Sequence, residues 1–258
     1  MHTALLQAAT LGRRAVVRTI RQPANIVFPL IFPMLLLAVN AGGLKAETQL
    51  PGFPTNSFLA FALAVPFVQG ALLATVNANV EFARDIQTGF LNRLALTPVR
   101  GIVLLLGQLG GLLTIALVQA VFYLVVGLAF GVRLESGIGG GLLLLVLEAA
   151  IALAFASFGC WAALRTGSTE AVQGLFPVFF VFLFLSSMNI PRNLIETDWF
   201  RWVATVNPVS YLIEAVRGIV IYDWRWETIG LGFGVAAAMC LIGFALATHA
   251  LMGRLERT

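Results

Sequence analysis

The feature that most constrains the fold is a series of long apolar runs that carry almost no charge. A helix needs about 20 apolar residues to cross the roughly 30 Å hydrocarbon core of a bilayer. Runs of about this length occupy residues 24–44, 57–80, 101–130, 138–164, 171–188 and 228–252. Because the backbone groups of a segment in lipid must pair within the protein, we expect each run to form a helix. The sequence therefore predicts an all-α polytopic membrane protein with six transmembrane helices, forming one domain over residues 1–258.

The composition agrees with a chain whose main solvent is lipid. Hydrophobic residues make up 59% of the chain, charged residues 11%, and the mean hydropathy is +0.93. A soluble domain carries about a quarter charged residues. The net charge of +4 would suggest nucleic acid in a soluble protein. Here the basic residues gather at the ends of the apolar runs, so we expect membrane lipid and no nucleic acid as a partner.

The distribution of Lys and Arg predicts the orientation of the spans. Ten of these residues fall on the side that holds both termini and the polar segment at 81–100, and six fall on the other side. The positive-inside rule therefore places both termini and this segment in the cytosol, and we expect a multi-pass protein of the plasma membrane. Trp199, Trp202, Trp224 and Trp226 then form an aromatic belt on the outer side.

The polar segments between the runs predict three further elements. Residues 1–21 combine apolar positions at helical spacing with four arginines, which indicates an amphipathic interfacial helix; a plain positive flank of the first span is the alternative. Residues 81–97 predict a short cytosolic helix on which a partner acts, or a connector without a partner. Residues 189–227 are too polar to span and too apolar for a free loop. They predict two short helices at the outer leaflet, with a break at Asn207 and Pro208.

Several kinds of chemistry have no support in the sequence. A nucleotide-binding P-loop needs a Gly-Lys pair, but Lys45 is the only lysine of the chain and follows Leu44. His2 and His249 lie at opposite ends, and Cys160 lies inside an apolar run, so no metal site is expected. We therefore expect no catalytic residues, no enzyme activity and no cofactor bound by this chain.

A small set of side chains inside the spans has functional potential. Glu148 is the one charged residue well inside a run, and an acidic residue in a membrane is a candidate proton relay or cation partner. A protonated structural acid is the alternative. Other polar residues line a path or join helices, and the phenylalanines form an apolar pocket or face lipid. The candidate path consists of Gln69, Gln119, Tyr123, Glu148, Phe180 and Phe184.

Two motifs resemble those of the ABC type-2 exporter permeases. The first runs from Glu81 to Gly101 and reads EFARDIQTGFLNRLALTPVRG. The second begins at Asn207 with NPVSYLIEAVRG and contains Arg217. Both motifs stand where that family has them relative to the six runs, so the resemblance covers nearly the whole chain. The sequence looks most similar to the daunorubicin-resistance type of drug exporter.

This resemblance implies a function and a set of partners. Two permease subunits, identical or related, would assemble with two ATPase subunits that bind ATP and Mg²⁺. The coupling helix on the ATPase would contain Glu81, Phe82, Arg84, Asp85, Gly89, Phe90, Leu91, Leu94, Thr97 and Pro98. An outer gate in the re-entrant segment would contain Asn207, Pro208, Tyr211, Glu214 and Arg217. The alternatives are a gradient-driven transporter or channel that uses Glu148, and an integral scaffold. The cargo stays open among drugs, lipids, peptides and glycan precursors.

Overall fold

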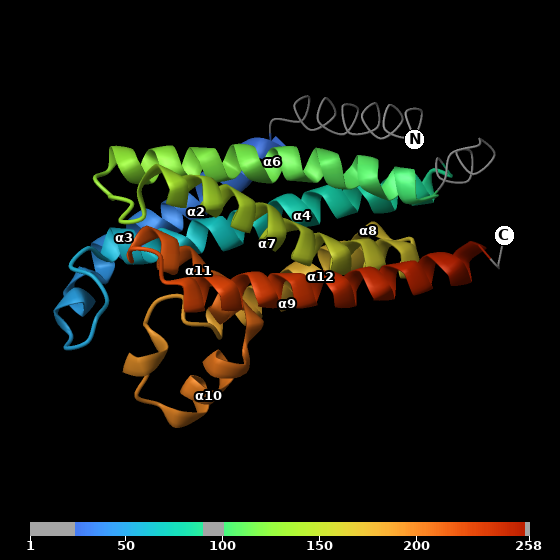
Figure 1. The fold of residues 1–258 in the computed structure, drawn as a ribbon. Helices are drawn as coiled ribbons and strands as arrows, with labels where there is room; N and C mark the ends of the chain where they lie inside the picture. Colours follow the sequence, from blue (N-terminus) through green and yellow to red (C-terminus); the bar gives the residue numbers. More distant parts are fainter. Residues whose placement is uncertain (1–23, 90–100, 256–258) are drawn as a thin grey trace.

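The computed structural model describes residues 24–89 and 101–255, and every regular element in these ranges is helical. The all-α class predicted from the sequence is confirmed. Four long helices lie side by side along one axis: α4 (Ala64–Gln87), α6 (Gly101–Ala129), α7 (Gly137–Thr166) and α12 (Trp226–Leu255) (Figure 1). The other helices of the bundle are α2 (Ala24–Gly43), α3 (Phe58–Ala62), α8 (Thr169–Gln173) and α9 (Leu175–Phe184). The predicted interfacial helix at residues 1–21 lies outside the described residues.

Within the described residues, four helical stretches are long and apolar enough to cross a bilayer. They are Phe58–Gln87, Leu109–Ala129, Gly137–Thr166 and Trp226–Gly253. Two shorter apolar stretches, Val27–Gly43 and Thr169–Phe184, lie at the predicted first and fifth spans. The chain is therefore a multi-pass membrane protein, and six spans stay a prediction.

Helix α4 lies at the centre of the bundle. It packs against α2, α6, α7 and α11 (Pro208–Val220). The most apolar part of its span is 89% buried within the subunit, whereas the corresponding part of α12 is only 28% buried. Apolar side chains at the bundle surface, such as Val125 and Leu241, suit a lipid environment because lipid does not penalise their exposure. A displacement of α4 would therefore disturb most of the other helices.

Polar side chains hold α4 and α7 in one register. Thr75 Oγ1 donates to the carbonyl of Ala152 at 3.3 Å, and Asn79 Nδ2 donates to the carbonyl of Ala156 at 3.4 Å. Both contacts join residues 77 positions apart, so the two helices run side by side in the same direction. Gly159 lies against the Asn79 amide, where a Cβ atom would clash. Such side chain to backbone contacts between helices are typical of membrane proteins.

The second span does not end at Val80, where the sequence suggested a boundary. Helix α4 continues without a break to Gln87, and Thr88 and Gly89 close it, with Gly89 in the left-handed region at φ +68°. No helix-breaking residue stands between Val80 and Gln87, and Phe82 and Ile86 are buried against the bundle. The first half of the expected coupling helix is thus an extension of the second span. Residues 90–97 lie outside the described residues.

The segment after α9 also differs from its predicted bounds. Helix α9 ends at Phe184, four residues before the predicted end of the fifth span, and residues 185–190 are turns and bends. The chain then forms η2 (Arg192–Leu194), α10 (Asp198–Val206) and α11. Helices α10 and α11 meet at Asn207, where the sequence predicts a break. Helix α11 packs inside the bundle, whereas α10 lies at its edge (Figure 1).

Candidate functional site

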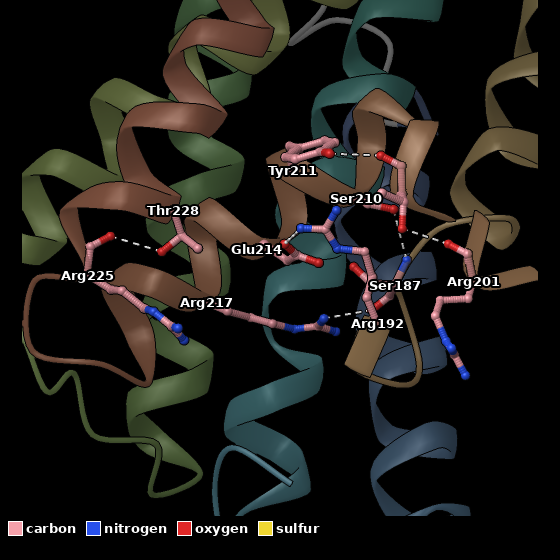
Figure 2. A network of polar contacts seen from close by, with 10 residues as sticks. Ser187, Arg192, Arg201, Ser210, Tyr211, Glu214, Arg217, Arg225 and Thr228 are labelled. Atoms are coloured by element: carbon pink, nitrogen blue, oxygen red, sulfur yellow. Dashed lines mark hydrogen bonds and ion pairs between the residues drawn. The ribbon is translucent and has the colours of Figure 1, made fainter. Parts of the chain in front are cut away.

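A polar network surrounds α11 at the end of the bundle where α3 lies. We call it the α11 network; it consists of Phe61, Ser187, Arg192, Asn207, Ser210, Tyr211, Glu214 and Arg217, most of which Figure 2 shows. Asn207 begins it. Its Oδ1 accepts a hydrogen bond from the Val209 backbone N–H at 2.9 Å, which caps the helix, and Pro208 occupies the first turn, where proline is tolerated. Its Nδ2 donates to the Phe182 carbonyl at 2.5 Å, which ties α11 to α9.

Arg217 lies at the centre of the network and is 4% exposed. Its guanidinium donates to three backbone carbonyls, those of Phe61 at 3.0 Å, Ser187 at 2.6 Å and Met188 at 2.6 Å. The guanidinium carbon also lies 3.4 Å from the centroid of the Phe61 ring. Removing a cation from water costs several kcal/mol, and hydrogen bonds from the planar guanidinium offset this cost. Arg217 thereby connects α11 with α3 and with the end of α9.

A second cation, Arg192, lies at the side of the network. Its Nη2 forms an ion pair with Glu214 Oε2 at 2.5 Å, and its guanidinium carbon lies 4.5 Å from the centroid of the Tyr211 ring. The Tyr211 hydroxyl donates to the Thr205 carbonyl at 2.8 Å in α10. The Ser187 backbone N–H donates to Ser210 Oγ at 3.1 Å. The network therefore spans the end of α3, the end of α9, η2, α10 and α11.

Four of the five residues expected at the outer gate, Asn207, Tyr211, Glu214 and Arg217, belong to this network, and the fifth, Pro208, begins α11 beside it. Their role as a gate stays a prediction. Sequence reasoning missed four members: Phe61, Ser187, Arg192 and Ser210. Arg217 and Phe61 are 156 positions apart, and the acceptor on Phe61 is a backbone carbonyl, which every residue has. No signal in the sequence marks such a partner. The contact between the Phe61 ring and Arg217 could be predicted only if it were known that α3 and α11 are neighbours.

The four polar residues of the expected path are buried inside the bundle. Gln69 lies on α4, Gln119 and Tyr123 on α6, and Glu148 on α7. Both oxygens of Glu148, both polar atoms of Gln119 and the Gln69 oxygen have no hydrogen-bond partner among the described residues. The Tyr123 hydroxyl donates to the Pro29 carbonyl of α2. These residues are considered further below.

The two phenylalanines of the expected path lie elsewhere. Phe184 is exposed on α9. Phe180 lies between Phe184, in an edge-to-face contact with ring centroids 5.1 Å apart, and Phe176, whose ring is tilted with its centroid 5.0 Å away. Phe180 also approaches Phe32 of α2 at 6.4 Å. The contacts of the described residues thus place Phe180 on an aromatic surface of α9 and α2, and the path is not one continuous set of side chains.

The polar end of α4 carries the described part of the expected coupling residues. Glu81 and Arg84 form an ion pair at 2.9 Å, and the Arg84 side chain is exposed. Phe82 is 4% exposed and packs in a cluster that includes Ala163 of α7 and Ala247 of α12. Phe82 therefore faces its own subunit and is not available to a partner in this conformation. Asp85 lies on α4, and Gly89 lies two residues after the end of that helix. The other expected coupling residues lie outside the described residues: Phe90, Leu91, Leu94, Thr97 and Pro98.

The bundle and its terminal network define a multi-pass helical membrane protein, and sequence comparison identifies its family. Residues 6–221 match the ABC-2 type transporter family. Because the match covers most of the sequence, the chain belongs to the ABC-2 type transporter family, and the resemblance seen in the two motifs is confirmed. The family consists of permease subunits of ABC transporters, which are not themselves catalytic.

Three curated relatives support this assignment. The putative transport permease ycf38 of Porphyra purpurea is 27% identical over 261 residues, which cover 95% of this chain and 89% of that protein. The protein of the same name from Pyropia yezoensis is 26% identical over 221 residues, with coverages of 84% and 74%. The probable doxorubicin resistance ABC transporter permease protein DrrC of Mycobacterium tuberculosis is 25% identical over 196 residues, with coverages of 76% and 68%.

Proposed function

We propose that this chain is the membrane-spanning subunit of an ABC exporter that moves a hydrophobic or amphipathic cargo outward. Two copies of a separate ATPase subunit, which bind ATP and Mg²⁺, supply the energy, and a second permease subunit, identical or related, completes the assembly. The chain resides in the plasma membrane with both termini in the cytosol. The relative named for doxorubicin resistance supports a drug-like cargo.

The continuity of α4 carries this proposal. Its 24 residues form a rod of about 36 Å that runs from the α11 network to the ion pair of Glu81 with the exposed Arg84. At the other end, the Phe61 carbonyl just before α4 accepts a hydrogen bond from Arg217. An ATPase that moves the polar end of α4 would therefore act directly on the α11 network.

The same geometry suggests how movement becomes transport. Helix α4 is enclosed by α2, α6, α7 and α11, so it moves as a rigid element and displaces its neighbours. A tilt of α4 draws Phe61 away from Arg217, and the carbonyls of Ser187 and Met188 then hold the arginine alone. The end of α9 separates from α3 at this point. Cargo leaves between them into the outer leaflet.

A charge reversal at the polar end of α4 tests the proposal. Arg84 is exposed and its ion pair with Glu81 contributes at most about 1 kcal/mol, so Arg84→Glu should leave the fold intact. We expect the tagged variant, purified from membranes of its native host, to retain several-fold less ATPase subunit than the unmodified protein. Lys45→Glu makes the same charge change at an exposed site, the first residue of η1 (Lys45–Gln49) at the other end of the bundle, and is the matched control.

Two outcomes would count against the proposal. Equal amounts of ATPase with both variants would show that this end of α4 is not the contact. If no ATPase accompanies the folded, unmodified protein, the exporter proposal fails. The second candidate, a gradient-driven transporter, is then favoured by the buried Glu148 carboxyl, which has no hydrogen-bond partner in the described part of the chain. It predicts that Glu148→Gln abolishes transport and that loss of an ATPase has no effect.

A further inference from the structure

The register of α4 and α7 determines which way Glu148 faces. Ala152 and Ala156 of α7 contact Thr75 and Asn79 of α4, and both pairs are 77 positions apart. Residues four positions apart lie on one face of a helix. Glu148 precedes Ala152 by four residues, so it lies on the same face and opposite Ala71, which precedes Thr75 by four. Glu148 is 0% exposed, and it lies about 16 Å along α7 from Gly137.

Helix α6 packs against both α4 and α7 near Glu148 and Ala71. Gly70, next to Ala71, allows the Tyr123 ring to approach so closely that a Cβ atom on Gly70 would lie 2.5 Å from it. Tyr123 belongs to the same buried cluster as Ala71 of α4 and Leu147 of α7, the residue that precedes Glu148. Gln119 lies one turn from Tyr123 on the same face of α6 and is fully buried. Glu148, Gln119 and Tyr123 thus come from two helices that meet around the small residues of α4.

The polar atoms in this region are rich in acceptors and poor in donors. In this region, the buried atoms that have no hydrogen-bond partner among the described residues are Glu148 Oε1 and Oε2, Gln119 Oε1 and Nε2, and Gln69 Oε1. Four of these are oxygens and one is an amide nitrogen. The Tyr123 hydroxyl does not donate to these oxygens, because its hydrogen is donated to the Pro29 carbonyl. The Gln119 amide nitrogen offers two N–H donors to four acceptor oxygens, and a hydrogen atom on Glu148 would convert one of these acceptors into a further donor.

The surrounding helices supply no charge that would hold an ionised carboxylate. The described titratable and charged side chains on α7 and on the helices packed against it are Glu81, Arg84, Asp85, Tyr123, Cys160, Arg165, Glu170, Tyr211, Glu214, Arg217, Glu227, Cys240 and His249. Among these, Arg217 is engaged with three carbonyls, and no side chain of the described residues forms a hydrogen bond with either Glu148 oxygen. Transferring an isolated carboxylate from water into such surroundings costs many kcal/mol, whereas transferring the neutral acid costs far less.

We propose that Glu148 is a proton-binding site that is occupied in this conformation, and that its proton stabilises the close packing of α4, α6 and α7. When these helices separate and water enters, the carboxyl O–H bond breaks, water takes the proton as hydronium and a hydrated carboxylate remains. The site belongs to the helical bundle itself. The inference therefore holds for either energy source, and its test is independent of any ATPase.

Infrared spectroscopy of the purified full-length protein at neutral pH tests the site directly. A protonated carboxyl has a carbonyl stretching band above the amide I band, and exposed acids are ionised at this pH. We expect one such band in the wild type, with slow exchange in D₂O, and its loss in Glu148→Gln. Glu227→Gln, at an exposed site at the start of α12, should leave the band unchanged. Absence of the band from the folded wild type overturns the proposal, whatever the variants do.

Thermal unfolding provides a second measurement. The folded state would bind one more proton than the unfolded chain near neutral pH, so stability falls as pH rises. We expect the melting temperature of the wild type to fall between pH 6 and pH 9 by more than that of Glu148→Gln, because the amide mimics the neutral acid and does not titrate. Equal slopes for the two proteins, with Glu227→Gln as a reference, would contradict a bound proton at Glu148.

Discussion

Arg217 illustrates how one side chain can hold together segments that are distant in the sequence. Its three acceptors belong to the end of α3 and to the turn after α9. Carbonyls at the ends of helices lack partners within the helix, so a fork of N–H donors satisfies several of them at once. The same residue needs these carbonyls, because a buried guanidinium has lost its water. The helix ends and the arginine therefore stabilise one another.

We predict that Arg217→Lys destabilises the protein although it keeps the charge. An ammonium cannot reproduce the planar arrangement of donors or the contact with the Phe61 ring, and a lost hydrogen bond to a charged group costs about 1.5–3 kcal/mol. Thermal and denaturant unfolding in detergent would measure the loss. Arg225→Lys, at an exposed site over Tyr222, should change stability little. Unchanged stability of Arg217→Lys would show that the carbonyls do not depend on the guanidinium.

At the scale of whole helices, glycines decide how closely α11 and α12 approach. A Cβ atom at Gly232 would overlap the Ala215 side chain and lie 3.1 Å from the Tyr211 carbonyl. The Tyr211 carbonyl belongs to the backbone of α11, so it cannot rotate away from the added atom as a side chain could. Two residues further along α12, a Cβ atom at Gly234 would meet no atom within 4 Å. The two glycines therefore differ in role although they lie in one helix.

We predict that Gly232→Ala separates α11 from α12 and costs about 1–3 kcal/mol, as overpacking of a core does. Gly234→Ala is the matched control. It should be neutral or stabilising by up to about 1 kcal/mol, because alanine favours the helix. The melting temperatures of the two variants give the comparison. Similar values for both would mean that α11 can shift without loss of packing.

At the scale of the molecule, the inner helix α4 joins the two ends of the bundle. The cluster around Phe82 and Ile86 continues the packing of the bundle to the polar end of α4, so this end is part of the folded body. Helix α4 ends and helix α6 begins at the same end of the bundle (Figure 1). The positive-inside rule predicts that this end faces the cytosol.

We predict opposite labelling of the two ends of the bundle in intact cells. In a background with Cys160 and Cys240 replaced by alanine, Glu196→Cys should react with a membrane-impermeant maleimide from outside. Thr88→Cys should react only after the membrane is permeabilised. Both positions are exposed in the structure, so access to the thiol is decided by the membrane alone. The reverse pattern would overturn the proposed orientation.

Much of the architecture follows from local sequence. The structure has helix within each long apolar run, as predicted, because hydropathy and backbone pairing act within a segment. The break between α10 and α11 was predictable from Asn207 and Pro208, since capping and the missing proline N–H are local effects. The family was recognisable from two motifs. The continuation of α4 past Val80 was missed, because a polar composition suggested a boundary that no helix breaker enforces.

The sequence by itself determined the all-α class of the protein, its family and where its long apolar segments lie. Only the tertiary structure decided what individual residues contact. Arg217 binds backbone carbonyls, Phe82 faces its own bundle, and Glu148 lies opposite Ala71 through a register set by Thr75 and Asn79. These facts depend on the rotation and register of whole helices. Packing between distant segments sets both, and the hydropathy of any one segment does not encode them.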